Sequence, residues 1–178
     1  MKRLNKAGFT LIELLAVITI MGILMMVAIP SVSRTIENSR RDTFADNALT
    51  YVNTVRNAVM ADELTCGTGS NAKTVSATAN GTYYFVIDTS DQATKDIMEK
   101  VALSSWGSAE LKGYVKWHKS SNATTGRTTT EYFVRLADTG LHGFKAEVSE
   151  KDVSRSKIYT EGANQVMAPA AGVACTLK

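Results

Sequence analysis

The sequence is poor in the residues that build catalytic and metal centres. It contains two histidines and two cysteines among 178 residues. Neither His118 nor His142 lies in a metal-binding spacing such as H-E-x-x-H, and the two distant cysteines make a weak metal site. Gly67 and Gly69 neither follow an expected strand nor precede a P-loop lysine. We therefore expect no catalytic site, no metal and no cofactor, and an enzyme is the least supported class of function.

The chain also has few prolines and a small net charge. The chain has only two prolines, and apolar residues are spread through its whole length, so it lacks a signature of disorder. The net charge of +3 comes entirely from Lys2, Arg3 and Lys6. A nucleic-acid-binding function inferred from the pI of about 8.8 would depend mostly on that short basic segment. The length suits one domain with a real core and hardly two.

What the sequence does contain is one long apolar segment near its start. Residues Phe9 to Ile29 read FTLIELLAVITIMGILMMVAI and include one ionisable residue, Glu13. As a helix this segment extends about 31 Å, which matches a hydrocarbon core of about 30 Å. The basic residues before it favour an N-terminus in the cytoplasm, so the chain after Pro30 is expected outside the membrane.

Three interpretations of this apolar segment compete. A secretory signal has an apolar core of only about 7–15 residues before a small-residue cut site, and no such site follows here. A plain membrane anchor fits the length but gives no reason for Glu13, although a charge in the bilayer costs up to about 2.5–3.5 kcal/mol and usually marks function. If the chain is cut between Gly8 and Phe9, the new amino group of Phe9 lies four residues before Glu13 and supplies a partner. We favour this third interpretation, a processed and polymerising helix.

The residues around this junction also resemble a known family. The stretch KAGFTLIELL, which begins at Lys6, closely resembles the processing site of type IV prepilins and pseudopilins of the N-methylphenylalanine class. That family has a short basic leader ending in glycine, then phenylalanine, then an apolar helix with a glutamate four residues later. The resemblance implies that a prepilin peptidase cuts after Gly8 and N-methylates Phe9. It also implies that Glu13 pairs with the N-terminal amine of a neighbouring subunit during assembly.

Pro30 is the second feature of the apolar segment. Its missing amide hydrogen, and the clash of its ring with the carbonyl of Met26, predict a kink or a locally melted turn. Pro30 matches a proline near the outer end of the pilin helix, so the resemblance implies that the helix loosens between Gly22 and Pro30 in a filament. A plain helix boundary at the membrane surface is the alternative.

After Pro30 the helical pattern continues with more polar residues. Apolar side chains recur every three or four positions and form one stripe, which indicates an amphipathic half-helix over residues 31–64 that packs on a sheet. The members of this stripe are Phe44, Ala48, Tyr51, Val52, Val55 and Val59. The helix is expected to end near Leu64, before the breaker-rich CGTGSN.

The rest of the chain predicts an antiparallel sheet. Strands are expected at 82–88, 111–118 and 130–137, with a further one at 144–148, and a short helix at 90–102. In the second strand, one face is expected to be buried and the other partly wet. The predicted fold class is α+β: a long helix, with a membrane-spanning half and an amphipathic half, packed on an antiparallel sheet as in the pilin fold.

Cys66 and Cys175 are the only cysteines, and outside the membrane a disulfide between them is chemically permitted. Such a bond would tie the C-terminal tail to the end of the long helix, and we favour it over two reduced thiols. Many pilins instead have both cysteines near the C-terminal end, so this spacing departs from the family pattern.

Together these observations predict a type IV pilus subunit used for adhesion, motility or aggregation. Its expected parts are a cleaved leader (1–8), a membrane-spanning half-helix (9–30), an amphipathic half-helix (31–64) and an extracellular head (65–178). Expected partners are identical subunits, the prepilin peptidase, the assembly machinery of the inner membrane, and the membrane before assembly. The alternatives are a pseudopilin of a type II secretion or competence system, and a minor pilin whose exposed loop 120–130 binds a surface or DNA.

Overall fold

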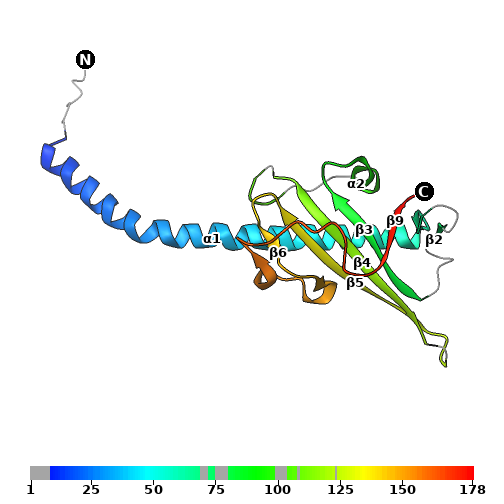
Figure 1. Cartoon of the computed structure of the whole chain (residues 1–178). Coiled ribbons are helices and arrows are strands. Elements are labelled where there is room, and N and C mark those ends of the chain that lie inside the picture. Colours follow the sequence, from blue (N-terminus) through cyan, green and yellow to red (C-terminus); the bar gives the residue numbers. More distant parts are fainter. Residues whose placement is uncertain (1–8, 69–71, 75–79, 99–103, 108, 123) are drawn as a thin grey trace, which may run out of the picture. The chain divides into compact units, whose positions relative to one another are not determined.

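Figure 1 shows the computed structural model, which describes residues 9–68, 72–74, 80–98, 104–107, 109–122 and 124–178. The chain divides into two compact units, one up to Ser39 and one from Arg40 onward. A single helix, α1 (Leu11–Met60), runs through both. In the second unit it packs on a mostly antiparallel sheet of nine strands, so the predicted α+β class is confirmed.

Within the second unit, α1 buries one face against the sheet. The residues of α1 that are buried recur at helical spacing, as the sequence predicted: Phe44, Ala45, Ala48, Tyr51, Val52, Val55 and Ala58. Val59, the remaining member of the predicted stripe, is half-buried and packs against the same core. The stripe is apolar because one side of the helix faces the sheet and the other faces water.

The helix ends at Met60, earlier than the predicted end near Leu64. Asp62 adopts a left-handed conformation with φ of 59°, and its N–H donates to the carbonyl of Val59 at 3.4 Å. The next N–H, of Glu63, donates to the carbonyl of Ala58 at 3.0 Å. These two bonds form a Schellman cap, which usually carries glycine at the position of Asp62 and was therefore not evident in the sequence.

The strands form one sheet in the order β2-β1-β9-β3-β4-β5-β6-β8, with β7 paired separately to β5. Every pairing is antiparallel except that of β3 with β9, which is parallel. The strands are β1 (Leu64–Cys66), β2 (Lys73–Thr74), β3 (Gly81–Asp88), β4 (Leu111–Ser121), β5 (Thr128–Asp138), β6 (Gly143–Phe144), β7 (Val148–Ser149), β8 (Ile158–Tyr159) and β9 (Val173–Leu177). The short helices are α2 (Gln92–Ile97), η3 (Glu150–Asp152) and η4 (Arg155–Lys157).

The three main predicted strands are confirmed as β3, β4 and β5, whereas the strand predicted at 144–148 is wrong. The structure has two short strands there, β6 and β7, each paired to a different part of β5. Between them, Glu147 binds Tyr114 and Lys116 on β4. The predicted helix 90–102 is shorter in the structure, because α2 ends at Ile97 and Met98 is extended; residues 99–103 lie outside the described part of the chain.

Gly113 permits β4 and β5 to approach each other closely. It pairs with Leu136, and a Cβ atom at this position would lie 2.0 Å from the carbonyl oxygen of Arg135. We predict that Gly113→Ala destabilises the second unit by about 2 kcal/mol or more, since the backbone of a central strand would have to move. Urea unfolding of the full chain in detergent measures this. The matched control is Gly22→Ala, where a Cβ would meet nothing within 4 Å. Equal unfolding midpoints for Gly113→Ala and the unmodified chain would contradict the prediction.

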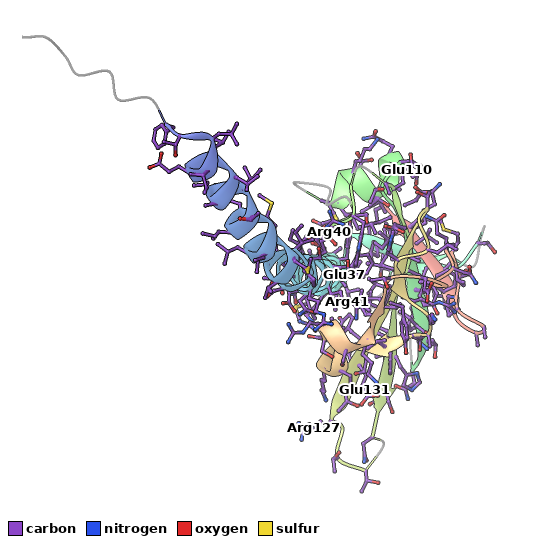
Figure 2. The ribbon with its side chains drawn as sticks, turned by 90° about the vertical axis from the view of Figure 1, so that its left-hand side faces the viewer. Glu37, Arg40, Arg41, Glu110, Arg127 and Glu131 are labelled. Carbon is purple, nitrogen blue, oxygen red and sulfur yellow. A yellow bond between two sulfur atoms is a disulfide. The ribbon has the colours of Figure 1, made fainter. Side chains whose placement is uncertain are left out.

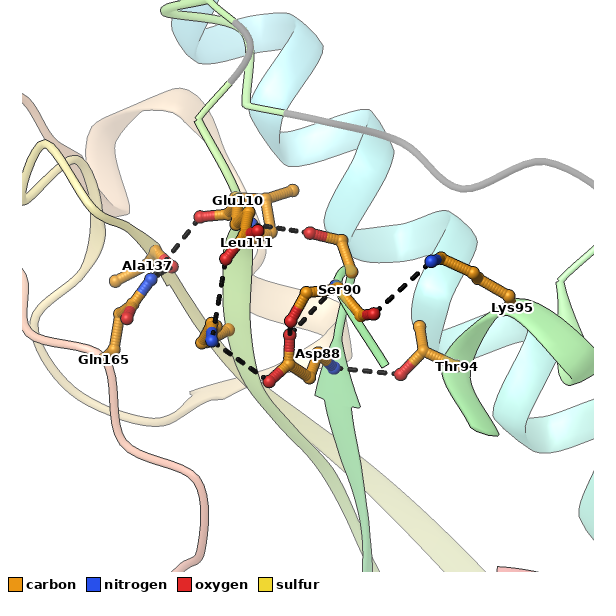
Figure 3. Close-up of polar contacts among 10 residues, drawn as sticks. Asp88, Ser90, Thr94, Lys95, Glu110, Leu111, Ala137 and Gln165 are labelled. Atoms are coloured by element: carbon orange, nitrogen blue, oxygen red, sulfur yellow. Dashed lines mark hydrogen bonds and ion pairs between the residues drawn. The ribbon is translucent and has the colours of Figure 1, made fainter. Parts of the chain in front are cut away.

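A polar network closes the end of the sheet at which β3 leads into α2 (Figure 3). The Asp88 carboxylate accepts hydrogen bonds from the N–H and hydroxyl groups of Ser90, and it pairs with the Lys112 ammonium at 3.2 Å. Partial burial raises the pKa of Asp88, but the contacts from Ser90 and Lys112 outweigh burial and leave this pKa below its ordinary value. The N–H of Asp88 donates to the hydroxyl of Thr94 on α2, which fixes the turn.

The C-terminal segment returns across the sheet to its far side. After β8 the chain passes the strands on the face away from α1 (Figure 1) and ends in β9, between β1 and β3. On the way, the side-chain amide of Gln165 lies 3.4 Å from the carbonyl oxygens of Glu110 and Ala137. Cys66 on β1 and Cys175 on β9 are directly opposed and form a disulfide. The pairing favoured by the sequence is therefore present in the structure.

Candidate functional site

The first unit presents an apolar helical surface with no cover. Every apolar residue of α1 before Ser39 is exposed, and the most accessible among the large ones is Leu11, at 84%. An 18-residue window here has a mean hydropathy of 2.6, and none of it is buried. The helix is thus long and apolar enough to cross a membrane. Leaving this surface in water would be costly, so the helix requires lipid or other helices around it.

Glu13 lies at the start of this helix and is held by Thr10. The N–H and hydroxyl groups of Thr10 both donate to Oε2 of Glu13, at 2.9 and 2.8 Å. In return, the N–H of Glu13 donates to the Thr10 hydroxyl at 3.3 Å. This is a capping box, in which the two side chains satisfy N–H groups that the helix leaves unpaired. The Thr-x-x-Glu spacing is visible in the sequence and is the signal that could have predicted this cap.

The capping box leaves part of the Glu13 carboxylate available. Within the described residues, no hydrogen bond reaches Oε1 of Glu13, while Oε2 accepts both bonds from Thr10. A carboxylate can accept about four hydrogen bonds. Glu13 can therefore keep its cap and still accept a cation from outside its own chain.

The other residues predicted for processing and assembly lie on or beside the same helix. Gly8 lies outside the described residues, and Phe9, two positions before the first residue of the helix, is 90% exposed. Gly22 and Pro30 are both within α1, which continues through Pro30 with helical residues on each side. The alternative of a plain helix boundary at Pro30 is therefore wrong, and no turn is melted at Pro30 in this chain. One reason is that the carbonyl freed by proline is a single lost bond within a helix of 50 residues. The loosening between Gly22 and Pro30 that is expected in a filament stays a prediction.

In the described part of the second unit, a compact polar cluster surrounds Asp138, which is fully buried. Its carboxylate accepts the Ser104 hydroxyl at 2.5 Å, the backbone N–H of His142 at 2.9 Å and the Nδ1 atom of the same histidine. The His142 ring stacks on Trp106 with centroids 4.6 Å apart. Since the serine and histidine both bind the carboxylate and not each other, the arrangement is a structural clamp and not an activated nucleophile. The described residues include no group of three or more potential ligands that could hold a metal.

The tip of the hairpin formed by β4 and β5 is exposed. All described residues from Ser120 to Glu131 are exposed, and Figure 2 shows Arg127 and Glu131 on this hairpin. The pairing of β4 with β3 stops at Lys119 opposite Gly81, so the hairpin extends beyond its neighbouring strand. Its exposed residues are mostly hydroxyl-bearing, and they form no catalytic arrangement.

The face of β4 that carries Tyr114 is partly wet, as predicted: Lys116 is half-buried and His118 is exposed, while Tyr114 itself is buried. Its hydroxyl donates to Oε2 of Glu147 at 3.1 Å. Burial, and then the nearby Glu147 carboxylate, raise the pKa of Tyr114 to about 12. Because an unfolded tyrosine ionises near pH 10, the stabilisation from the neutral phenol is complete below about pH 10 and is lost as the pH rises towards about 12.

We therefore expect Tyr114→Phe to remove part of the loss of stability that occurs above about pH 10. The measurement is urea unfolding at several alkaline pH values, together with an absorbance titration of the six tyrosines. Tyr84→Phe is the matched control, because the Tyr84 ring lies edge-on to the Tyr114 ring with their centroids 6.4 Å apart. If the unmodified chain and Tyr114→Phe lose stability equally above pH 10, the pKa of Tyr114 is not raised in the folded chain.

A comparison with protein-family models agrees with the helix just described. Residues 3–29 match the model of the prokaryotic N-terminal methylation motif. This motif is the signature of type IV pilin and pseudopilin prepilin-like proteins, so the resemblance inferred from the sequence is confirmed. The match supports a type IV pilin-like or pseudopilin protein, a class that is structural and not catalytic.

The same match carries implications for processing and location. The motif implies processing by a prepilin peptidase and assembly into pilus-like polymers. The motif and the apolar helix together fit a membrane-anchored precursor. No curated protein and no solved structure matches the chain.

Proposed function

We propose that the protein is a structural subunit of a type IV pilus. It is cut after Gly8, N-methylated at Phe9 and polymerised through α1 into a surface fibre for adhesion, motility or aggregation. The observation that carries this proposal is the uncovered apolar start of α1, which lies within the methylation motif. Residues 9–30 contain a single carboxylate, Glu13. Such a helix can move from lipid into a bundle of identical helices without passing through water.

The proposed parts of the chain follow from this role. Residues 1–8 are a leader, and residues 9–30 span the membrane and later form the fibre interior. Residues 31–64 contain the amphipathic half of the helix and its end, and residues 65–178 form the head. The precursor crosses the membrane once with its N-terminus in the cytoplasm. The Cys66–Cys175 disulfide supports a head outside the cytoplasm, because such bonds form and persist in oxidising compartments.

Assembly depends on two features of the helix. The free side of the Glu13 carboxylate accepts the N-terminal amine of a neighbour, which supplies polar pairing and fixes the axial register of the subunits. Pro30 and Gly22 let the helix loosen between them when the neighbouring helices pack, because proline has already removed one of the hydrogen bonds in this stretch.

The test is intact mass and N-terminal sequencing of protein sheared from native cells. We expect a chain that begins at methylated Phe9 in the sheared, fibre-containing fraction. The same N-terminus found only in the membrane fraction would favour a pseudopilin of a type II secretion or competence system, or a minor pilin. A start at Met1, or a cut beyond Pro30, would overturn processing at Gly8 and with it the proposed function.

A further inference from the structure

A leucine in a strained conformation is exposed on the turn that joins β5 to β6. Leu141 has a φ of 63°, and its side chain is 46% exposed. Bulky residues rarely adopt this left-handed conformation, which costs free energy and is concentrated at functional positions. Glycine would take the same conformation without that cost. Because the exposed part of the leucine packs on nothing in its own chain, a contact outside the chain is indicated.

The surroundings of Leu141 hold it in place. The next residue, His142, is clamped by the buried Asp138 carboxylate and stacks on the Trp106 ring. Beside this tryptophan, the hydroxyl of Ser105 donates to the carbonyl of Arg40 at 2.7 Å, at the start of the second unit's part of α1. We call Leu141, His142 and Trp106 the Leu141 corner. It is a fixed apolar projection at one end of the second unit.

A pocket of about 320 Å³ lies in the same unit, between the end of α1 and the hairpin of β4 and β5. Val59, Tyr132 and the largely exposed Met60 form apolar parts of its wall. An apolar cavity of about 150 Å³ accommodates benzene, so this pocket has room for the side chain of one leucine. Its charged lining residues are already engaged: Arg56 lies in an ion pair, and Lys119 interacts within its own chain. The pocket therefore favours an apolar occupant.

The Leu141 corner and the pocket lie too far apart to meet within one chain. Thr130 of β5 lines the pocket, and Thr139 follows the last residue of β5 in the turn that carries Leu141. These nine positions extend about 30 Å along a strand. Figure 1 shows the same separation, with β6 at one end of the sheet and the end of α1 at the other. An apolar projection and an apolar pocket at opposite ends of one unit can join identical subunits head to tail.

We propose that Leu141 of one subunit inserts into the pocket beside Met60 of another subunit of the fibre. The contact uses two different surfaces of the same chain, so it can repeat without closing into a pair, as a filament requires. Burial of Leu141 offsets the strain of its backbone, and the unbranched side chain of Met60 can adjust around it. The contact rests on the proposed function, because it needs a polymer, and it adds a bond between heads to the packing of α1.

The experiment joins neighbouring subunits in sheared fibres with a short bifunctional thiol reagent. The variant Thr130→Cys/Thr139→Cys places one thiol at the pocket and one beside Leu141, while it retains both Leu141 and Met60. The native cysteines form a disulfide and do not react. We expect a ladder of linked chains that extends beyond dimers. It should contain at least about tenfold more linked product than the control Thr130→Cys/Lys157→Cys, whose second thiol lies on the exposed η4.

The possible outcomes separate this contact from the proposed function. Abundant fibres that give no ladder, or no more product than the control, would overturn the contact and leave the pilus subunit in place. A ladder that stops at dimers would indicate a closed pair and would overturn it as well. Absence of fibres from cells with the unmodified chain would contradict the proposed function, and the contact would fall with it.

Leu141→Gly tests the contact without added thiols. Because glycine adopts the φ of this turn without strain, the variant should unfold in urea at the same or a higher midpoint than the unmodified chain. We nevertheless expect the amount of sheared fibre to fall by about tenfold or more, since the buried leucine is lost at every contact. An unchanged amount of fibre would overturn the proposal. A lower midpoint together with less fibre would assign Leu141 to the fold and would also overturn it.

Discussion

Cells that express Glu13→Ala should insert the subunit into the membrane normally but assemble few or no fibres. Removing a carboxylate makes the apolar helix easier to insert, since the charge is the costly group in the segment. Fibre formation suffers because each subunit loses its polar pairing with a neighbour, about 1–2 kcal/mol at each contact. The contact repeats at every subunit, so we expect the amount of sheared fibre to fall by about tenfold or more. Membrane fractionation and quantification of the sheared fraction measure the two steps separately.

Two further variants separate the charge of Glu13 from its role in the helix cap. Glu13→Gln retains an acceptor for the Thr10 N–H but loses the charge, and we expect it to behave like Glu13→Ala. Thr10→Val removes the hydroxyl bonds to Glu13 but keeps the charge, and should reduce fibres far less. Abundant fibres from Glu13→Ala would remove Glu13 from the mechanism. A defect in Thr10→Val as severe as in Glu13→Ala would assign the effect to the cap and not to the charge.

Loss of the disulfide is expected to have the largest effect on the stability of the second unit. Cys66 and Cys175 are separated by 109 positions, and the chain-entropy model assigns about 4–5 kcal/mol to closing a loop of this length. Replacing both by serine should therefore lower the free energy of unfolding by about that amount. Urea unfolding of the full chain in detergent, followed by tryptophan fluorescence, provides the measurement.

Reductant supplies the control for this prediction. The unmodified chain should lose stability when a reducing agent is added, whereas the double serine variant should be insensitive to it. If the midpoints of the unmodified chain with and without reductant are equal, the bond does not stabilise the unit as predicted. A single variant, Cys66→Ser, leaves one thiol free to pair between molecules and is less informative than the double variant.

The sequence was sufficient to predict the main elements because their signals are local. The apolar stripe of α1 follows from a spacing of three and four, and the strands at 82–88, 111–118 and 130–137 are rich in β-branched and aromatic residues. The N-terminal motif was recognisable because its basic residues, glycine, phenylalanine and glutamate lie within a short stretch. Thr10 could have been identified in the same way, from its spacing to Glu13.

What the sequence did not predict depends on contacts between distant residues. The strand expected at 144–148 is interrupted because Glu147 binds Tyr114, which lies 33 positions earlier. The helix end at Met60 depends on Asp62 taking a conformation more usual for glycine. The parallel pairing of β9 with β3 could not be anticipated, because the segment from Ile158 onward shows no clear period and its last strand pairs with residues about 90 positions away.

The place of β9 in the sheet also sets the order in which the subunit can mature. Because β9 lies between β1 and β3, the described part of strands β1 and β2 is joined to the rest of the sheet by hydrogen bonds only through β9. A ribosome must therefore release the chain through β9 before the sheet is continuous, and pairing over such distances is slow. A chain truncated before Val173 leaves the edge of β3 exposed and Cys66 without its partner. Formation of the disulfide thus reports that a chain extends at least to Cys175, and it distinguishes chains that carry β9 from shorter fragments.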